Sequence, residues 1–199
     1  MRISLLLLAL LAPLPALAQH RGADPDWPCV QRLVPKLTMA ALWAGPAPQA
    51  AWREQPVVSS LVERIAPRTV PEAEGVAAIS AFTEPLDATA RRLLLPIAFD
   101  GLLEQTNAQR DVLIEQIRRF TRRQRELAEL SRRLAAELRT LAASAPSEER
   151  AELEQRRYFT AKAFEDAERT LRYACEAPVR LEGRLGAYAR ALSAALPAD

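Results

Sequence analysis

Residues 113–141 read LIEQIRRFTRRQRELAELSRRLAAELRTL, and apolar side chains recur in this stretch at alternating steps of four and three residues. The repeat runs through Leu113, Ile117, Phe120, Gln124, Leu127, Ser131, Leu134, Leu138 and Leu141. This heptad spacing is typical of a helix that packs along one stripe against another helix. Good helix formers dominate residues 97–145, and no proline interrupts them. We therefore expect one long helix, which could begin as early as Asp87 with a kink at Pro96.

A second heptad pattern follows a short break at residues 143–146. It runs through Leu153, Arg157, Thr160, Phe164, Ala167, Leu171 and Ala174, and Ser147 is the expected N-cap of this second helix. When the chain folds back at the break, a single register places Leu138 opposite Leu153 and Phe120 opposite Leu171. Glu137 and Arg156 then flank the seam on one side. The two segments predict an antiparallel coiled-coil hairpin over residues 97–177.

The rest of the chain predicts a helical base for this hairpin. Prolines are frequent in residues 19–96, so only short helices fit there, at residues 38–44, 57–66 and 72–82. Thr69 is the expected cap of the third. A C-terminal helix is expected over residues 179–196, after Pro178, with Leu181, Leu185, Tyr188, Leu192 and Ala195 on one stripe. The predicted fold is all-α, with residues 19–199 as a single domain.

Residues 1–18 have the layout of a secretory signal peptide. Arg2 precedes an apolar run from Leu5 to Leu11, and Ala16-Leu17-Ala18 forms a small-residue cleavage motif. A buried N-terminal helix is the alternative interpretation. The apolar run is too short to span a bilayer, and we predict a periplasmic or secreted protein that does not span the membrane. In an oxidising compartment the two cysteines, Cys29 and Cys175, are expected to form a structural disulfide; in a cytosolic protein they would be two buried thiols.

Basic residues concentrate on the first long helix. Residues 115–133 contain seven arginines and three glutamates, a net charge of +4, whereas the whole chain carries only +2. The candidate partner-binding residues are Arg118, Arg119, Arg122, Arg123, Arg132 and Arg133. The alternative is a solvated face with a few ion pairs, each of which contributes about 0.2–1 kcal/mol. The small overall charge gives no reason to expect a nucleic-acid partner.

The sequence offers little that would support catalysis. The single histidine, His20, lies at the start of the expected mature chain, so neither Ser-His catalysis nor a multi-histidine metal site is predicted. No cofactor is expected. Trp27, Trp43 and Trp52 could line a ligand pocket at the base, or could anchor the proline-rich segment to the helices.

These observations favour an exported, non-enzymatic binding or assembly factor that uses its hairpin or base as the contact surface. Another envelope or secreted protein is the expected partner, and the oligomeric state is left open. The alternative function is a carrier of a small ligand in an aromatic-lined pocket at the base. A hydrolase built on two converging carboxylates is the third hypothesis.

Overall fold

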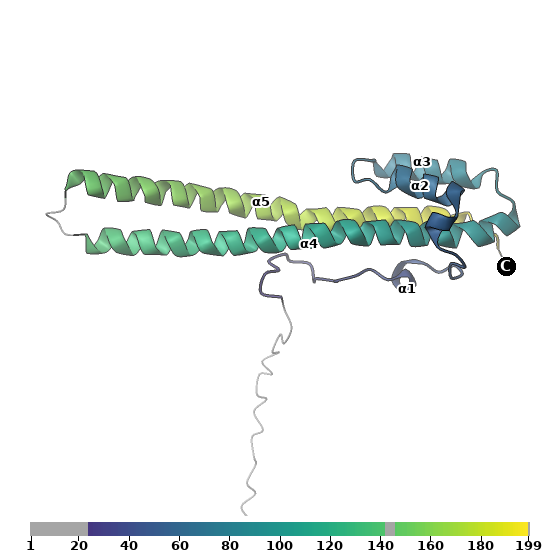
Figure 1. Ribbon diagram of the computed structural model, residues 1–199, viewed down its shortest axis with the longest axis horizontal. Coiled ribbons are helices and arrows are strands. Elements are labelled where there is room, and N and C mark those ends of the chain that lie inside the picture. Colours follow the sequence, from purple (N-terminus) through teal and green to yellow (C-terminus); the bar gives the residue numbers. More distant parts are fainter. Residues whose placement is uncertain (1–23, 142–145, 199) are drawn as a thin grey trace, which may run out of the picture.

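Two long antiparallel helices span the protein in the computed structural model, which describes residues 24–141 and 146–198 (Figure 1). They are α4 (Ala88–Thr140) and α5 (Ser147–Ala194). The shorter elements lie toward the end away from the hairpin turn: α1 (Met39–Leu42), the 3-10 helix η1 (Trp52–Glu54), α2 (Pro56–Ile65) and α3 (Glu72–Thr83). The predicted all-α fold, with a helical base and a long coiled-coil hairpin, is confirmed. The predicted signal peptide, residues 1–18, lies outside the described residues.

Helix α4 is a single helix of 53 residues, about 80 Å long at 1.5 Å per residue. Its start agrees with the earlier of the expected positions, because the Asp87 carboxylate accepts a hydrogen bond from the backbone N–H of Ala90 at 2.8 Å. Pro96 lies within the helix and is buried in the core of the base. At its other end α4 reaches Thr140, just before the expected break at residues 143–146, most of which lies outside the described residues.

Helix α5 corrects two predictions. Ser147 is the first helical residue and not the cap, since Pro146 occupies the N-cap position. The helix also continues through Pro178 to Ala194, where the sequence had predicted a break and a separate helix over residues 179–196. Proline inside a helix removes one hydrogen bond and crowds the preceding turn. Burial against α4 on both sides of Pro178, at Leu171 and Leu181, offsets this cost and keeps the two segments in one helix.

The seam between the long helices follows the predicted heptads with one local shift. Leu113, Ile117, Leu127 and Leu134 are buried as expected. Phe120, however, is 39% exposed, and its neighbour Thr121 is buried in its place. An α-helix of 3.6 residues per turn drifts by about 20° per heptad against a strict seven-residue repeat. The drift moves the next residue into the seam, where the Thr121 hydroxyl donates to the Ile117 carbonyl at 3.0 Å.

Contacts at the base of the hairpin agree with the predicted register. That register places Arg110 opposite Leu181, and Arg110 Nε lies 2.9 Å from Glu182 Oε1, one residue further along. Near the tip, Glu137 and Arg156 line the same hollow from opposite helices, as the register requires, but these two side chains form no ion pair. Arg157, a charged residue at a predicted seam position, is exposed.

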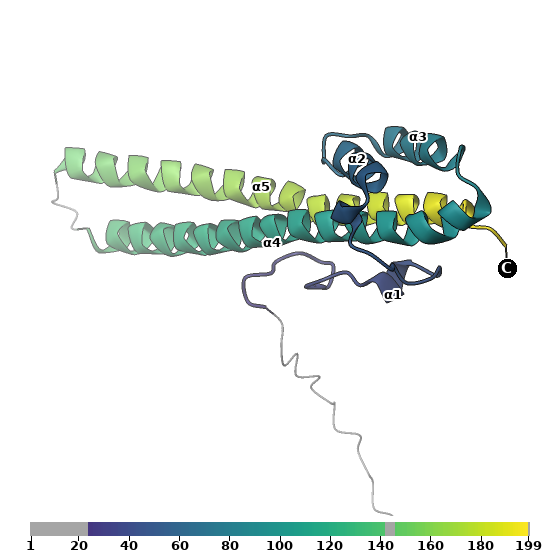
Figure 2. The same cartoon turned by 45° about the vertical axis from the view of Figure 1, so that its right-hand side comes forward.

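The core lies at the base, where α2 and α3 cover one side of the hairpin (Figures 1 and 2). The short helices lie close to their predicted positions, and α2 contributes Val58, Leu61, Val62 and Ile65 to the core. Helix α3 follows Pro71, which occupies the N-cap position, so the predicted cap at Thr69 is wrong. The predicted C-terminal stripe is confirmed, because Leu181, Leu185, Tyr188 and Leu192 are all buried, and its last member, Ala195, is half-buried.

Candidate partner-binding surface

A segment near the N-terminus, residues 24–37, lies along the hairpin on the side opposite α2 and α3 (Figures 1 and 2). We call it the N-terminal strap. Its last residue, Leu37, exchanges two hydrogen bonds of 3.0 Å with the side-chain amide of Asn107 on α4. Further along, Arg110 Nη2 donates to the Val34 carbonyl at 2.7 Å. Side chains of α4 therefore satisfy backbone groups of a segment that has no regular structure of its own.

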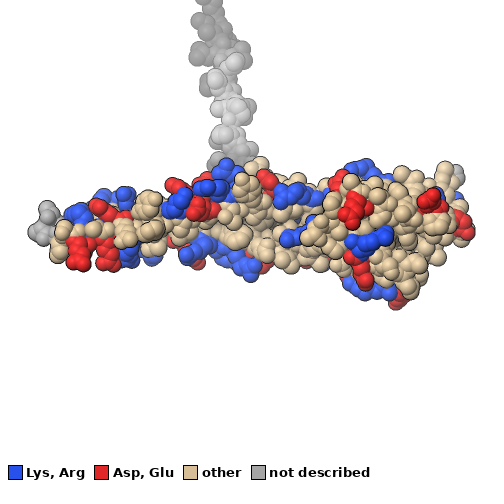
Figure 3. Space-filling view, turned by 90° about the horizontal axis from the view of Figure 1, so that it is seen from above, with Lys and Arg blue, Asp and Glu red and all other residues tan. Residues whose placement is uncertain are grey.

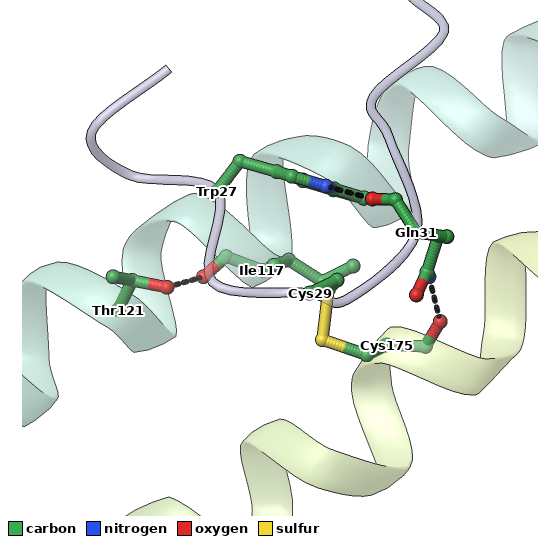
Figure 4. Close-up of a disulfide and its surroundings, with 6 residues drawn as sticks. All are labelled: Trp27, Cys29, Gln31, Ile117, Thr121 and Cys175. Atoms are coloured by element: carbon green, nitrogen blue, oxygen red, sulfur yellow. Dashed lines mark hydrogen bonds between the residues drawn. A yellow bond between two sulfur atoms is a disulfide. The ribbon is translucent and has the colours of Figure 1, made fainter. Parts of the chain in front are cut away.

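The predicted disulfide ties this strap to α5. Cys29 and Cys175 are bonded, with their Cα atoms 5.5 Å apart (Figure 4). Hydrogen bonds support the bridge on both sides, because Trp27 Nε1 donates to the Gln31 carbonyl at 2.8 Å and Gln31 Nε2 donates to the Cys175 carbonyl at 2.5 Å. The Cys175 carbonyl lies one turn before Pro178, so the strap also supplies a donor next to the proline in α5.

Two strap aspartates form ion pairs with three arginines of α4. Asp24 lies 2.7 Å from Arg118 and Asp26 lies 2.8 Å from Arg122, while Arg125 also pairs with Asp26. The pKa of Asp24 is lowered, chiefly because its carboxylate accepts the backbone N–H of Asp26 and also through Arg118. The Asp26 pKa is lowered mainly by Arg122 and next by Arg125. This end of the arginine-rich stripe is therefore occupied by the protein's own acidic residues.

The remaining arginines of the predicted site behave in two ways. Arg123 and Arg132 pair with glutamates on their own helix, at 3.3 and 2.9 Å, in exposed geometry that adds little stability. Arg119 and Arg133 are exposed and form no ion pair with any described residue. Acidic and basic side chains are interspersed on the face of the hairpin seen in Figure 3. The structure thus divides the predicted stripe into a covered part, a locally paired part and two free side chains.

Arg110 is a structurally important residue that the sequence analysis missed. Its side chain is only 2% exposed, and it joins the strap to both long helices through the Val34 carbonyl and Glu182. Its Nη1 atom is buried without a hydrogen-bond partner. Residue 110 is one heptad before Ile117, so extending the heptad towards the N-terminus would have placed this arginine in the seam.

The three tryptophans do not come together. Trp27 belongs to the strap, whereas Trp43 and Trp52 are buried in the base. Trp43 stacks on Phe99 with ring centroids 5.0 Å apart, and its indole N–H donates to the Pro46 carbonyl. The Trp52 indole N–H donates to Glu104 at 2.9 Å. These contacts match the anchoring interpretation, in which each ring buries its area and satisfies its polar group.

Exposed aromatic side chains occur on α5, and the sequence did not predict them as candidate site residues. Tyr158, Phe159 and Tyr173 are 66%, 59% and 66% exposed. The rings of Tyr158 and Phe159 meet edge to face, with centroids 5.5 Å apart. A soluble helix rarely exposes several aromatic rings, and such rings are enriched in protein interfaces. Their signal in the sequence was an aromatic residue at heptad positions that do not face the seam.

The hollows of the described surface have few features of a reaction centre. The hollow at the hairpin tip measures about 510 Å³ and contains Glu137, Glu149 and Glu152 with Arg156. No group of three or more described His, Cys, Asp or Glu residues could hold a metal ion. Burial, with the nearby charge of Glu104, raises the pKa of Asp100.

The charged and aromatic side chains described above can offer ion pairs, hydrogen bonds and apolar contact to a partner.

No protein-family model, curated protein or solved structure matches this chain. Among the described residues, no helix combines the length and the apolar character needed to cross a bilayer.

Proposed function

We propose that this is an exported, non-enzymatic binding factor that contacts another protein through the outer part of its hairpin. We call this part the distal hairpin and define it as residues 118–140 of α4 and 147–173 of α5. The observation that carries the proposal is the exposure of Tyr158, Phe159 and Tyr173 on this part of α5. Aromatic side chains bury a large area at a low cost in conformational entropy, which makes them frequent anchors of interfaces.

The base is less suited to such a contact because its apolar groups already face one another. Helices α2 and α3 cover the hairpin there, and Trp43, Trp52 and Phe99 are buried in one core. Apart from the ion pairs that Arg118, Arg122 and Arg125 form with the strap, each long helix of the distal hairpin has only the other to pack against. Most seam positions of α5 in this part are only half-buried. A partner that lies on the distal hairpin would therefore bury surface that the protein itself leaves open.

Export is supported by two independent features. The first 18 residues of the sequence have the order of charge, apolar run and small residues found in signal peptides. The Cys29–Cys175 disulfide is a kind of bond that persists in oxidising compartments. A partner in the same compartment, such as an envelope or secreted protein, follows from this localisation.

Photo-crosslinking in the producing cells tests the proposal. The full chain would carry benzoylphenylalanine in place of Phe159 and, as a matched control, in place of Val57, which is similarly exposed on α2 in the base. We expect irradiation to give a discrete adduct for position 159 and none for position 57. Absence of an adduct at position 159, or an equal adduct at position 57, would overturn the proposal.

A further inference from the structure

The two sides of the hairpin are covered by different elements and to different lengths. The strap covers one side, through contacts that reach Asn107 and Arg118. Helices α2 and α3 cover the opposite side of the base, where Gln109 and Arg184 donate to the carbonyl of Ala66 at 2.9 and 2.7 Å (Figures 1 and 2). Beyond the base, no described segment covers this second side, which we call the open face.

The heptad repeat identifies the residues of the open face in the distal hairpin. Residues seven apart share a side of a coiled coil, so counting from Gln109 and Arg184 reaches Leu130 on α4 and Ala163 on α5. Three residues further on, on the same side, are Arg133 on α4 and Asp166 on α5. Glu126 and Phe159 are one heptad before these two residues. We define the open face by these six residues: Glu126, Leu130, Arg133, Phe159, Ala163 and Asp166.

Charges of opposite sign alternate along the α4 edge of this face. Arg119, Glu126 and Arg133 follow one another at seven-residue spacing. Arg119 and Arg133 have no ion pair with a described residue, and the carboxylate of Glu126 pairs only with Arg123, at an exposed site. An alternating series of this kind is self-complementary when a second copy runs in the opposite direction, because each positive position can then meet a negative one.

We propose that the occupant of the open face is a second copy of this chain, related by a two-fold axis, with the two hairpins antiparallel and their bases at opposite ends. This inference rests on the proposed function and names its partner. Arg133 of each copy faces Glu126 of the other, and the axis passes close to Leu130. On α5, Phe159 lies opposite Ala163 of the second copy, where a small side chain leaves space for the ring. Asp166 then faces Arg156 of the second copy.

The arrangement of the base selects this register. A parallel dimer across the open face would place both sets of α2 and α3 in the same space. An antiparallel dimer with Arg119 opposite Glu126 would bring each hairpin tip to the level of residue 104, where Trp52 bonds to Glu104. With Arg133 opposite Glu126, the tip at residue 141 reaches the level of residue 118 and stops short of the Gln109–Ala66 contact.

The overlap is large enough for a specific dimer. It comprises residues 118–140 of α4 in each copy, about 35 Å of helix, together with the facing part of α5. Two helices side by side are about 20 Å wide, so each copy would bury about 700 Å². Stable, specific interfaces bury about 800 Å² per partner. We therefore expect a dimer whose association depends on protein concentration and on the charges at its ends.

A crosslinking experiment locates the two-fold axis. Since Cys29 and Cys175 are bonded to each other, a thiol introduced by Leu130→Cys is the reactive one in the purified protein. A short bismaleimide is expected to join two copies through this position. Val112→Cys is the matched control, because residue 112 is exposed on α4 outside the overlap. Equal dimer yield from the two variants, or none from Leu130→Cys, would overturn the proposal.

Charge reversal tests the register. In sedimentation equilibrium we expect the full mature chain to shift towards dimer as its concentration rises. Arg133→Glu and Glu126→Arg, each altering two symmetric contacts, should each weaken association about tenfold or more. The double variant restores opposite charges and should recover most of the loss. A double variant no better than either single one would refute the register, and a monomeric wild-type protein would refute the dimer.

The outcomes separate this inference from the proposed function. A monomeric protein whose benzoylphenylalanine at position 159 crosslinks to a different polypeptide would leave the proposed function intact and remove the second copy. Adducts of twice the chain's own mass, confirmed by peptide mapping between Phe159 and the segment around Ala163, would support both. Absence of adducts together with a monomeric mass would overturn both.

Discussion

Removing the Cys29–Cys175 disulfide should destabilise the whole protein, although the bond joins only a strap to a helix. The two cysteines are 146 residues apart, so the bridge closes a loop that contains every element from α1 to α4 and more than half of α5. For a loop of this length, the chain-entropy relation gives a loss of about 5 kcal/mol in the free energy of unfolding when the bond is absent. Typical domains have 5–15 kcal/mol in total, so this loss is a large share of the stability.

The measurement compares the oxidised protein with a variant carrying Cys29→Ser and Cys175→Ser. We expect the variant to keep its helical circular-dichroism signal at low temperature but to unfold at lower urea concentration, with a melting temperature lower by about 10–20 °C. Reduced wild-type protein serves as the control, since it lacks the bond but keeps both side chains. A loss of less than about 1 kcal/mol in both samples would refute the loop-entropy argument.

The variant without the disulfide also allows the contribution of the ion pairs to the strap's attachment to be measured. Without the bond, the ion pairs of Asp24 and Asp26 are among the few contacts that hold its first residues. Both carboxylates have a lowered pKa in the folded protein, so their stabilisation is complete above the ordinary value of 3.8 and is lost as the pH falls through the folded pKa. The indole N–H resonance of Trp27 should therefore move towards a solvent-exposed shift below about pH 4 in the variant. An unchanged resonance at pH 2.5 would contradict this mechanism.

Two further expectations concern the base and can be checked by urea unfolding. Gly75→Ala should cost about 1–3 kcal/mol, because a Cβ there would overlap the buried ring of Tyr188, whereas Gly183→Ala, with no atom near its Cβ, should add about 0.5–1 kcal/mol. Equal effects of the two glycine substitutions would contradict this view of the packing. Glu182→Ala should cost about 2 kcal/mol by leaving the buried Arg110 guanidinium without its carboxylate, and Arg110→Met should cost less because it removes the charge itself. The reverse order would show that Arg110 acts mainly through its other contacts.

The hairpin could be predicted because its determinants are local and periodic. Seam residues recur every three or four positions, and the short break before Pro146 leaves room for little except a reversal of direction. The break at Pro178 was wrongly predicted for the opposite reason. Whether a proline ends a helix depends on the packing around it, and Pro178 lies between Leu171 and Leu181, which are buried against α4. The periodicity of one helix does not show whether a second helix, here α4, packs against it on both sides of a proline.

The candidate site could be predicted only in part, because charge alone does not show which side chains are already occupied. Besides Glu115 on their own helix, Arg118 and Arg122 pair with Asp24 and Asp26, which are more than 90 residues away in the sequence, in a segment without periodicity. Their pairing depends on where the strap lies, and the disulfide fixes that only in three dimensions. The presence of two cysteines in the sequence did predict the disulfide itself. Phe159 was missed because an aromatic residue outside the seam indicates a binding surface only once its side chain is known to be exposed.

The distal hairpin has fewer buried contacts than the base to offset the entropy cost of ordering its residues. Ordering a residue costs about 1–2 kcal/mol of backbone entropy, and in the base this cost is offset by a core that several elements share. In the distal hairpin only one seam is available, and most seam positions on its α5 side are half-buried, while Phe159 and Tyr158 add apolar area that faces outward. Burial of the Phe159 ring on a second hairpin would supply part of the missing stabilisation. The distal hairpin should accordingly show slower amide exchange at concentrations where the dimer forms, and this gain should be absent from Arg133→Glu.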